Sequence, residues 1–106
     1  MKTYKLESMK NGWFIGDFIP SVLKTKDFEV AVVKHSKGSF WPCHYHKVAK
    51  EINFIINGKM RIQDTELCSG DIFVIDPWEI ADPVFHEDVS IVVIKVPSLV
   101  GDKYEV

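Results

Sequence analysis

The sequence predicts an all-β fold, a small sandwich or barrel, from three observations. Its apolar runs are short and rich in Val, Ile and Phe, which is typical of strands. Gly, Pro, Asn and Asp interrupt these runs at short intervals, as turns require. A long amphipathic run with helical period is absent. We therefore expect strands at residues 13–15, 28–34, 39–46, 51–56, 59–64, 71–75 and 90–96.

The first three predicted strands are defined by residue type and by the glycines beside them. Residues 13–15 join two aromatic side chains to an isoleucine, and residues 28–34 form a run centred on valines. Residues 39–46 follow Gly38 and contain three aromatic side chains. This third strand also carries two of the four histidines of the chain.

The dipeptide Asn57-Gly58 separates the fourth and fifth predicted strands. Asn and Gly both accept the positive φ that the two central positions of a type I′ turn require. We therefore expect residues 51–56 and 59–64 to pair as a hairpin. The turn residues that bound the last two strands are Ser69-Gly70-Asp71, Asp76-Pro77 and Asp82-Pro83.

Length and composition exclude several classes of protein. The 106 residues are 46% hydrophobic and 26% charged, so we expect one folded domain over residues 1–106 rather than a disordered chain. The formal net charge of -2 lacks the basic excess that nucleic-acid backbones attract. The charged N-terminal residues lack a secretory apolar run, and no stretch is long and apolar enough to span a membrane. We expect a cytoplasmic protein without nucleic-acid or membrane partners, whose two cysteines are free thiols.

The segment His44-Tyr45-His46 carries the strongest chemical signal in the chain. Alternate residues of a strand face the same side, so the two imidazoles would project together, about 7 Å apart along the chain. Glu51 lies far enough beyond His46 for the next strand to return beside the first. Two imidazoles and one carboxylate suit a divalent metal, with iron, manganese, zinc and nickel all possible. The alternative is that the three side chains are ordinary surface residues.

Around this segment the sequence has the wider spacing Gly38-x5-His44-x-His46-x4-Glu51-x6-Gly58. This pattern resembles the first motif of the cupin superfamily. The resemblance implies a double-stranded β-helix, also described as a jelly-roll barrel, with the ligands of this motif facing inward. It also implies that His44, His46 and Glu51 hold one divalent metal ion.

A second, altered motif follows at the spacing found in cupins. It reads Gly70-x6-Pro77-x-Glu79-x2-Asp82-x3-His86, where the family has Gly, His and Asn at the last three fixed positions. Asp82 stands at the position of the third metal-binding histidine, and the resemblance therefore implies it as a fourth ligand. An alignment without the gap places Ala81 at that position instead and leaves a site of three ligands. His86 is expected to line the substrate pocket.

Two further expectations follow from strand alternation. Asn53 shares the side of Glu51, so it is expected to face the same cavity and bind substrate or orient a metal-bound water. Ile52, Phe54 and Ile56 would point outward and need a cover. The N-terminal aromatic residues could supply part of that cover, and a second subunit the rest, which predicts a homodimer.

These residues support more than one function. The first hypothesis is a metal-dependent enzyme, of oxygenase or of isomerase or lyase type, acting on a small polar molecule. The second is a non-catalytic module that binds a small molecule or sugar through its metal. A third, a metal-free isomerase with a histidine base, leaves the chelating set without a role. Cupins host many reactions, so the resemblance indicates the scaffold rather than the activity.

Overall fold

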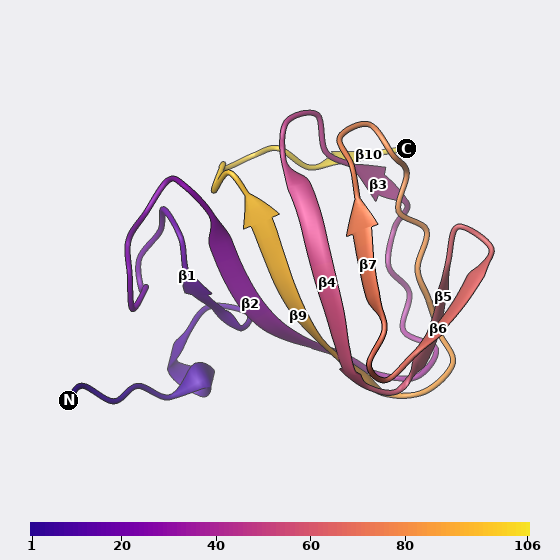
Figure 1. Ribbon diagram of the computed structural model, residues 1–106, viewed down its shortest axis with the longest axis horizontal. Helices are drawn as coiled ribbons and strands as arrows, with labels where there is room; N and C mark the ends of the chain where they lie inside the picture. The colour runs from indigo at the N-terminus through magenta and orange to yellow at the C-terminus, as the bar shows by residue number, and fades with distance from the viewer.

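The protein consists of antiparallel strands in three sheets, with one 3-10 turn at Leu6–Ser8 and no α-helix (Figure 1). The computed structural model describes all residues from 1 to 106. None of its segments forms a helix with the length and apolarity of a membrane span. The strands are β1 Trp13–Ile15, β2 Glu29–His35, β3 His44–Tyr45, β4 Lys50–Asn57, β5 Lys59–Ile62, β6 Thr65–Cys68, β7 Ile72–Ile75, β8 Val84–Phe85, β9 Val89–Val96 and β10 Tyr104–Glu105.

The largest sheet has five strands in the order β1-β2-β9-β4-β7. A three-stranded sheet, β6-β5-β8, and a two-stranded sheet, β10-β3, complete the barrel. Strand β9 shows how the sequence gives the large sheet one core-facing side. Its buried residues Val89, Ile91 and Val93 alternate with less buried ones, so every second side chain points into the core. The alternating side chains of the large sheet meet Met60 and Phe85 of the smaller sheet in one core. The prediction of an all-β barrel is confirmed.

The hairpin predicted at Asn57-Gly58 is wrong. Strand β4 pairs with β7 and β9, whereas β5 pairs with β6 and β8, so this dipeptide carries the chain from one sheet to another. Gly58 has a φ of 97° and lies against the backbone of Asp88, where no side chain fits. The two-residue turn lies instead at Gln63-Asp64, with φ of 49° and 59°, between β5 and β6.

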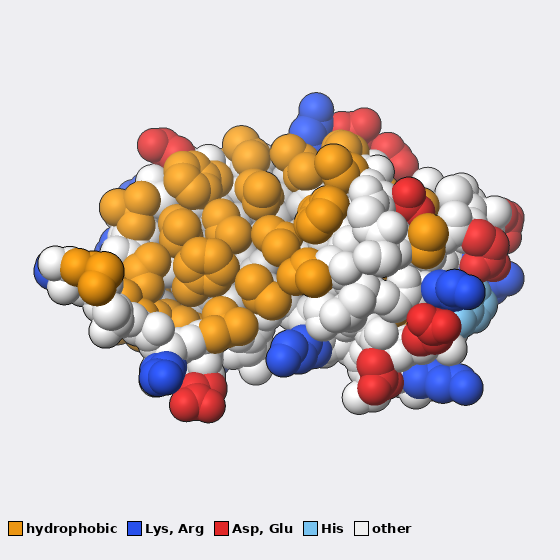
Figure 2. Space-filling model, turned by 60° about the horizontal axis from the view of Figure 1, so that its bottom comes forward, with side chains coloured by type: hydrophobic (Ala, Val, Ile, Leu, Met, Phe, Trp, Pro, Cys, Tyr) orange, Lys and Arg blue, Asp and Glu red, His pale blue; other side chains and the backbone are white.

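The outer face of the large sheet is apolar. Two rows of paired residues cross four strands, and neither row contains a charge: Val30, Ile94, Ile52 and Val74, then Val32, Val92, Phe54 and Ile72. Phe54 and Ile56 are each 41% exposed, and Ile72 is 66% exposed. Figure 2 shows hydrophobic side chains gathered over this sheet, with charged groups around them. We call this surface the apolar face.

Trp13 and Phe18, two of the N-terminal aromatic residues, do not cover the apolar face as expected. Strand β1 pairs with the edge of β2 and extends the sheet, and Trp13 lies opposite Ala31 of the core side. The Trp13 ring packs edge-on against Phe18, with ring centroids 6.5 Å apart. The apolar face is therefore left uncovered in the single chain.

Candidate functional site

A cavity of about 460 Å³ lies between the large sheet and the smaller ones. We call it the inner cavity. Strand β4 contributes Glu51 and Asn53 to its wall, and β3 contributes His44. These side chains share the inward side of their strands with core residues, as alternation predicted. The volume is within the usual range for small-molecule sites.

Both imidazoles of the predicted pair are held by backbone carbonyls. His44 Nδ1 donates to the carbonyl of Pro42 at 3.0 Å, and His46 Nδ1 donates to the carbonyl of Asp102. A carbonyl only accepts, so in each neutral ring the proton lies on Nδ1 and Nε2 keeps a free lone pair. Metal-binding histidines use the same arrangement of a donated ring N–H and a free nitrogen.

The Nε2 atom of His46 is buried and has no hydrogen-bond partner. It lies 3.8 Å from Glu51 Oε1, and the two imidazole rings are 5.5 Å apart between centroids. The other carboxylate oxygen of Glu51 accepts from Asn53 Nδ2 at 3.3 Å. The structure therefore brings His44, His46, Glu51 and Asn53 into one neighbourhood.

These donors do not form a closed coordination sphere. No three His, Cys, Asp or Glu side chains in the chain converge tightly enough to enclose a metal ion. The donor chemistry nevertheless fits a divalent ion, because the unpartnered His46 Nε2 is a buried ligand atom beside a carboxylate. An ion would have to draw these side chains closer together.

Burial favours neutral imidazoles around the inner cavity. It lowers the pKa of His44, and the nearby charge of Lys103 acts in the same direction, against the opposing effect of the Pro42 carbonyl. Burial alone lowers the pKa of His35, whose ring stacks on Phe85 with centroids 4.2 Å apart. Neutral imidazole is the form that binds metals, so the environment of His44 is compatible with ligation.

Asp82 lies outside the inner cavity, contrary to its expected role as a fourth ligand. Ala81 exchanges two backbone hydrogen bonds with His44 and is buried at the cavity wall. Because neighbouring residues of an extended chain face opposite sides, Asp82 points outward. Its carboxylate accepts from the backbone N–H of Gln63 at 2.8 Å. The placement matches the ungapped alternative, with Ala81 at the position of the third histidine.

His86 also lies away from the pocket that it was expected to line. Its ring is exposed and forms an ion-pair contact of 2.9 Å with Glu66 on β6. The preceding residue, Phe85, occupies the inward position on β8. Cys43 and Cys68 are free and exposed, and neither lines the inner cavity.

Asp102 is a supporting residue that the sequence did not reveal. Its buried carboxylate accepts from the backbone N–H groups of Lys47, Val48 and Ala49 at 2.9 to 3.1 Å. Burial alone would raise the pKa of Asp102, but these hydrogen bonds lower it overall. Asp102 thus holds both the loop after His46 and, through its own carbonyl, the His46 ring.

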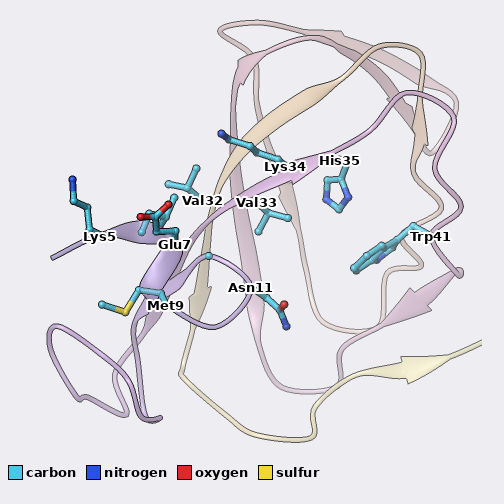
Figure 3. Close-up of a pocket in the computed structure, with 11 residues that line it drawn as sticks. Lys5, Glu7, Met9, Asn11, Val32, Val33, Lys34, His35 and Trp41 are labelled. Carbon is cyan, nitrogen blue, oxygen red and sulfur yellow. The ribbon is translucent and has the colours of Figure 1, made fainter.

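A second and larger pocket, of about 730 Å³, adjoins the inner cavity near the N-terminal segment (Figure 3). The two share Asn11, Val33, His35 and Trp41. In Figure 3, His35 and Trp41 point into the barrel, whereas Lys34 points away from it. The larger pocket contains none of His44, His46 and Glu51. His44 and Glu51 line the inner cavity and His46 lies behind its wall beside Glu51, so the inner cavity is the candidate functional site.

Comparisons with solved structures show which fold encloses this site. A double-stranded β-helix protein of Klebsiella pneumoniae, itself uncharacterised, shares 19% identity at a TM-score of 0.72, over 98% of this chain and 90% of its own. Other similar structures are cupin proteins, among them one from Bacteroides fragilis at 26% identity and a TM-score of 0.57, over 73% of each chain. The chain has the cupin fold. The expected cupin resemblance is confirmed at the level of structure.

Two enzymes are also among the cupin-fold neighbours. The DMSP lyase DddQ of Ruegeria pomeroyi shares 18% identity at a TM-score of 0.71, over 86% of this chain and 48% of its own. A nucleoside dehydratase of Streptomyces shares 14% identity at a TM-score of 0.72, over 100% of this chain and 91% of its own. No protein-family model and no curated protein matches the sequence. At these identities the likeness concerns the fold alone.

Proposed function

We propose that the protein is a metal-dependent enzyme of lyase or isomerase type, acting on a small polar molecule in the inner cavity. The observation that carries the proposal is the buried, unpartnered Nε2 of His46, aimed at Glu51 beside a second imidazole. His44, His46 and Glu51 are the residues that would hold the ion. Two proteins of the same fold are a lyase and a dehydratase, and for this reason we name this reaction class first.

The roles of the protein groups follow from their contacts. The carbonyls of Pro42 and Asp102 orient the two imidazoles, and the Asn53 amide orients the Glu51 carboxylate. The aromatic and aliphatic cavity wall limits access of water to the site. A bound divalent ion supplies Lewis acidity toward a substrate oxygen.

The position opposite His44 favours an enzyme over a non-catalytic binding module. Ala81 occupies that position and offers no ligand atom, so the protein would leave coordination positions for substrate or water. A module that only binds metal would be expected to close the sphere with protein ligands. The binding-module alternative predicts metal and ligand uptake without turnover.

Metal content of protein purified without added metal tests the proposal. We expect close to one divalent ion per chain in the wild type and negligible metal in His44→Ala, His46→Ala and Glu51→Ala. Asp82→Ala and His86→Ala are matched controls that should keep their metal, because both side chains point away from the cavity. Equal and negligible metal in the wild type and all variants would remove the proposal.

We also infer that a second copy of this chain covers the apolar face. Its two rows carry no charge, so an identical uncharged surface can pack against them. They also provide no charged group that a different partner could recognise. At its border, Lys50 already pairs with Asp76 within the chain at 3.4 Å, leaving little charge to be matched. Sedimentation at micromolar concentration should give the mass of two chains, and the mass of one would contradict this.

A further inference from the structure

Two lysines line the inner cavity besides the proposed metal ligands. Lys95 lies on β9, on the inward side that it shares with Val93, and Lys103 lies just before β10. Each ammonium lies over an indole ring: Lys95 Nζ is 5.1 Å from the Trp13 centroid, and Lys103 Nζ is 4.5 Å from that of Trp41. The aromatic rings therefore help to position both cations at the wall of the cavity.

Neither ammonium is neutralised by a direct ion pair, since no carboxylate oxygen lies within 4.0 Å of either one. Glu29 and Glu51 flank Lys95 on neighbouring strands, and of the two only Glu51 lines the inner cavity. Burial raises the pKa of Glu29 despite the opposing charge of Lys95. Burial, followed by the charge of Lys95, lowers the pKa of Lys103, which indicates an ammonium lacking sufficient compensating charge.

The remaining wall of the cavity is apolar or neutral. Phe73 and Phe85 line it together with Trp41, and His35 stacks on Phe85 with its pKa lowered by burial. A ligand that satisfies both parts of this wall needs an anionic end and an apolar body. Once Glu51 is neutralised by the proposed metal ion, the two ammonium groups leave the cavity with an excess of positive charge.

We propose that the inner cavity binds a small carboxylate with an apolar body, whose carboxylate group is held by Lys95 and Lys103. The inference rests on the proposed function, because it names the substrate class of the same site. The lysines bind and orient the substrate, and the metal ligands remain His44, His46 and Glu51. Loss of a lysine should weaken binding of an acid much more than binding of the matching neutral amide.

Benzoate and benzamide are probes of equal shape and different charge. Titration of the purified protein, followed by its tryptophan fluorescence, to which Trp13 and Trp41 of the cavity wall contribute, should show benzoate binding at least about tenfold more tightly than benzamide. Lys95→Met and Lys103→Met should each remove most of that preference while keeping the aliphatic stem over the indole. Lys103→Arg should retain it, and Lys59→Met is a control for the same charge change outside the cavity.

Equal affinity for the two probes in the wild type would overturn the proposal, as would an unchanged benzoate preference in both Met variants. Metal content measured on the same samples separates this result from the proposed function. Metal-free wild-type protein with a lysine-dependent benzoate preference would contradict the metal centre and support the carboxylate site. Metal-containing protein without that preference would support the metal centre and contradict the carboxylate site.

Discussion

Individual side chains of the inner cavity are adapted to remain neutral or to be held in one orientation. His35 is the clearest case, because its ring packs against Phe85 and Trp41 and burial alone lowers its pKa. A folded-state pKa below the unfolded value means that the unfolded chain binds the proton more readily. The stabilisation is therefore present above about pH 6.5 and is lost as the pH falls through the folded pKa.

We expect His35→Phe to reduce the acid sensitivity of the metal-free protein. In the wild type the free energy of unfolding should fall between pH 7.5 and 5.5, by at most about 1.4 kcal/mol per pH unit for each such histidine. Phe keeps the ring stacked on Phe85 but cannot be protonated. Urea unfolding at both pH values measures the slope, and His86→Gln is the exposed control. Equal slopes in the wild type and His35→Phe would contradict this prediction.

Metal retention should also depend on pH. His44 and His46 would bind an ion only as neutral imidazoles, so protonation competes with the metal. We expect metal to be released as the pH falls below about 6, the range in which an ordinary imidazole gains its proton. Elemental analysis after dialysis at a series of pH values tests this. Full retention near pH 4 would show that the imidazoles are not ligands.

Short connecting elements determine the shape of the barrel more than the long strands do. The corner at Gly58 combines a positive φ with close contact, since a Cβ there would lie 2.3 Å from the carbonyl oxygen of Asp88. Gly70 has a similar φ of 91°, but a Cβ there would meet open space. Comparing substitutions at the two glycines therefore separates the free-energy cost of backbone strain from that of a steric clash.

We expect Gly58→Ala to lower the free energy of unfolding by about 2–4 kcal/mol, because strain in φ adds to the clash with Asp88. Gly70→Ala should cost only about 1–2 kcal/mol, for the φ strain alone. Chemical denaturation of both variants beside the wild type gives the comparison. The interpretation of this corner would be wrong if the two substitutions were equally destabilising.

The C-terminal segment is a strap across the barrel. Strand β10 pairs with β3, and Asp102 fixes the loop at residues 47–49 that follows His46. The pKa of this carboxyl is lowered in the folded state, so its stabilisation exists above about pH 3.9 and disappears under stronger acid. The strap therefore supports strand β3 and the loop that follows it, which carry the proposed metal ligands His44 and His46.

Asp102→Ala should lower the free energy of unfolding by about 2–4 kcal/mol, because three backbone N–H groups lose a charged acceptor. Asp102→Asn should be milder, since the amide keeps one acceptor oxygen. Metal affinity should fall in both variants as the His46 loop loosens. Urea unfolding and metal titration measure the two effects, and wild-type values in Asp102→Ala would contradict the role of the strap.

Strand alternation allowed most of this architecture to be predicted. The long strands β2, β4 and β9, and the inward placement of His44, Glu51 and Asn53, follow from apolar runs and from a period of two residues. Strands of only two residues, such as β8 and β10, carry no period, so they were missed. Strand β6 was missed as well, because the Gln63-Asp64 turn that precedes it was placed inside the predicted strand 59–64. The hairpin prediction at Asn57-Gly58 was wrong because a positive φ, which closes a hairpin turn, also suits a corner between two sheets.

Other parts of the site depend on contacts between distant segments. No pattern in the C-terminal sequence indicates that Asp102 and Lys103 belong to the site. They lie beside it because β10 pairs with β3. Lys95 could have been found, because it continues the inward side of Ile91 and Val93 on β9. Asp82 could also have been rejected by alternation once Ala81 was placed opposite His44.

At the scale of the whole molecule, the large sheet has the inner cavity on one side and the uncovered apolar face on the other. The inner cavity lies on the inward side of the large sheet, and the apolar face is the opposite side of the same strands. Association through the apolar face would leave the cavity unobstructed. Large exposed apolar patches are uncommon on monomers and mark interaction surfaces.

We expect Phe54→Lys to convert the protein to a monomer without unfolding it, because the substitution places a charge in the middle of the apolar face. Val100→Lys is the matched control, an apolar residue that is 83% exposed and outside that face. Sedimentation should give half the wild-type mass for Phe54→Lys only, with unchanged far-ultraviolet circular dichroism. A wild-type mass for Phe54→Lys would exclude this surface as the interface.

The contact between His46 and the backbone of Asp102 joins positions 56 residues apart. During synthesis on the ribosome, the imidazole is made long before the carbonyl that orients it. A nascent chain that has already formed most of its strands would therefore still lack the group that orients the His46 ring. Uptake of the proposed metal ion would be delayed until Asp102 has left the exit tunnel and β10 has paired with β3.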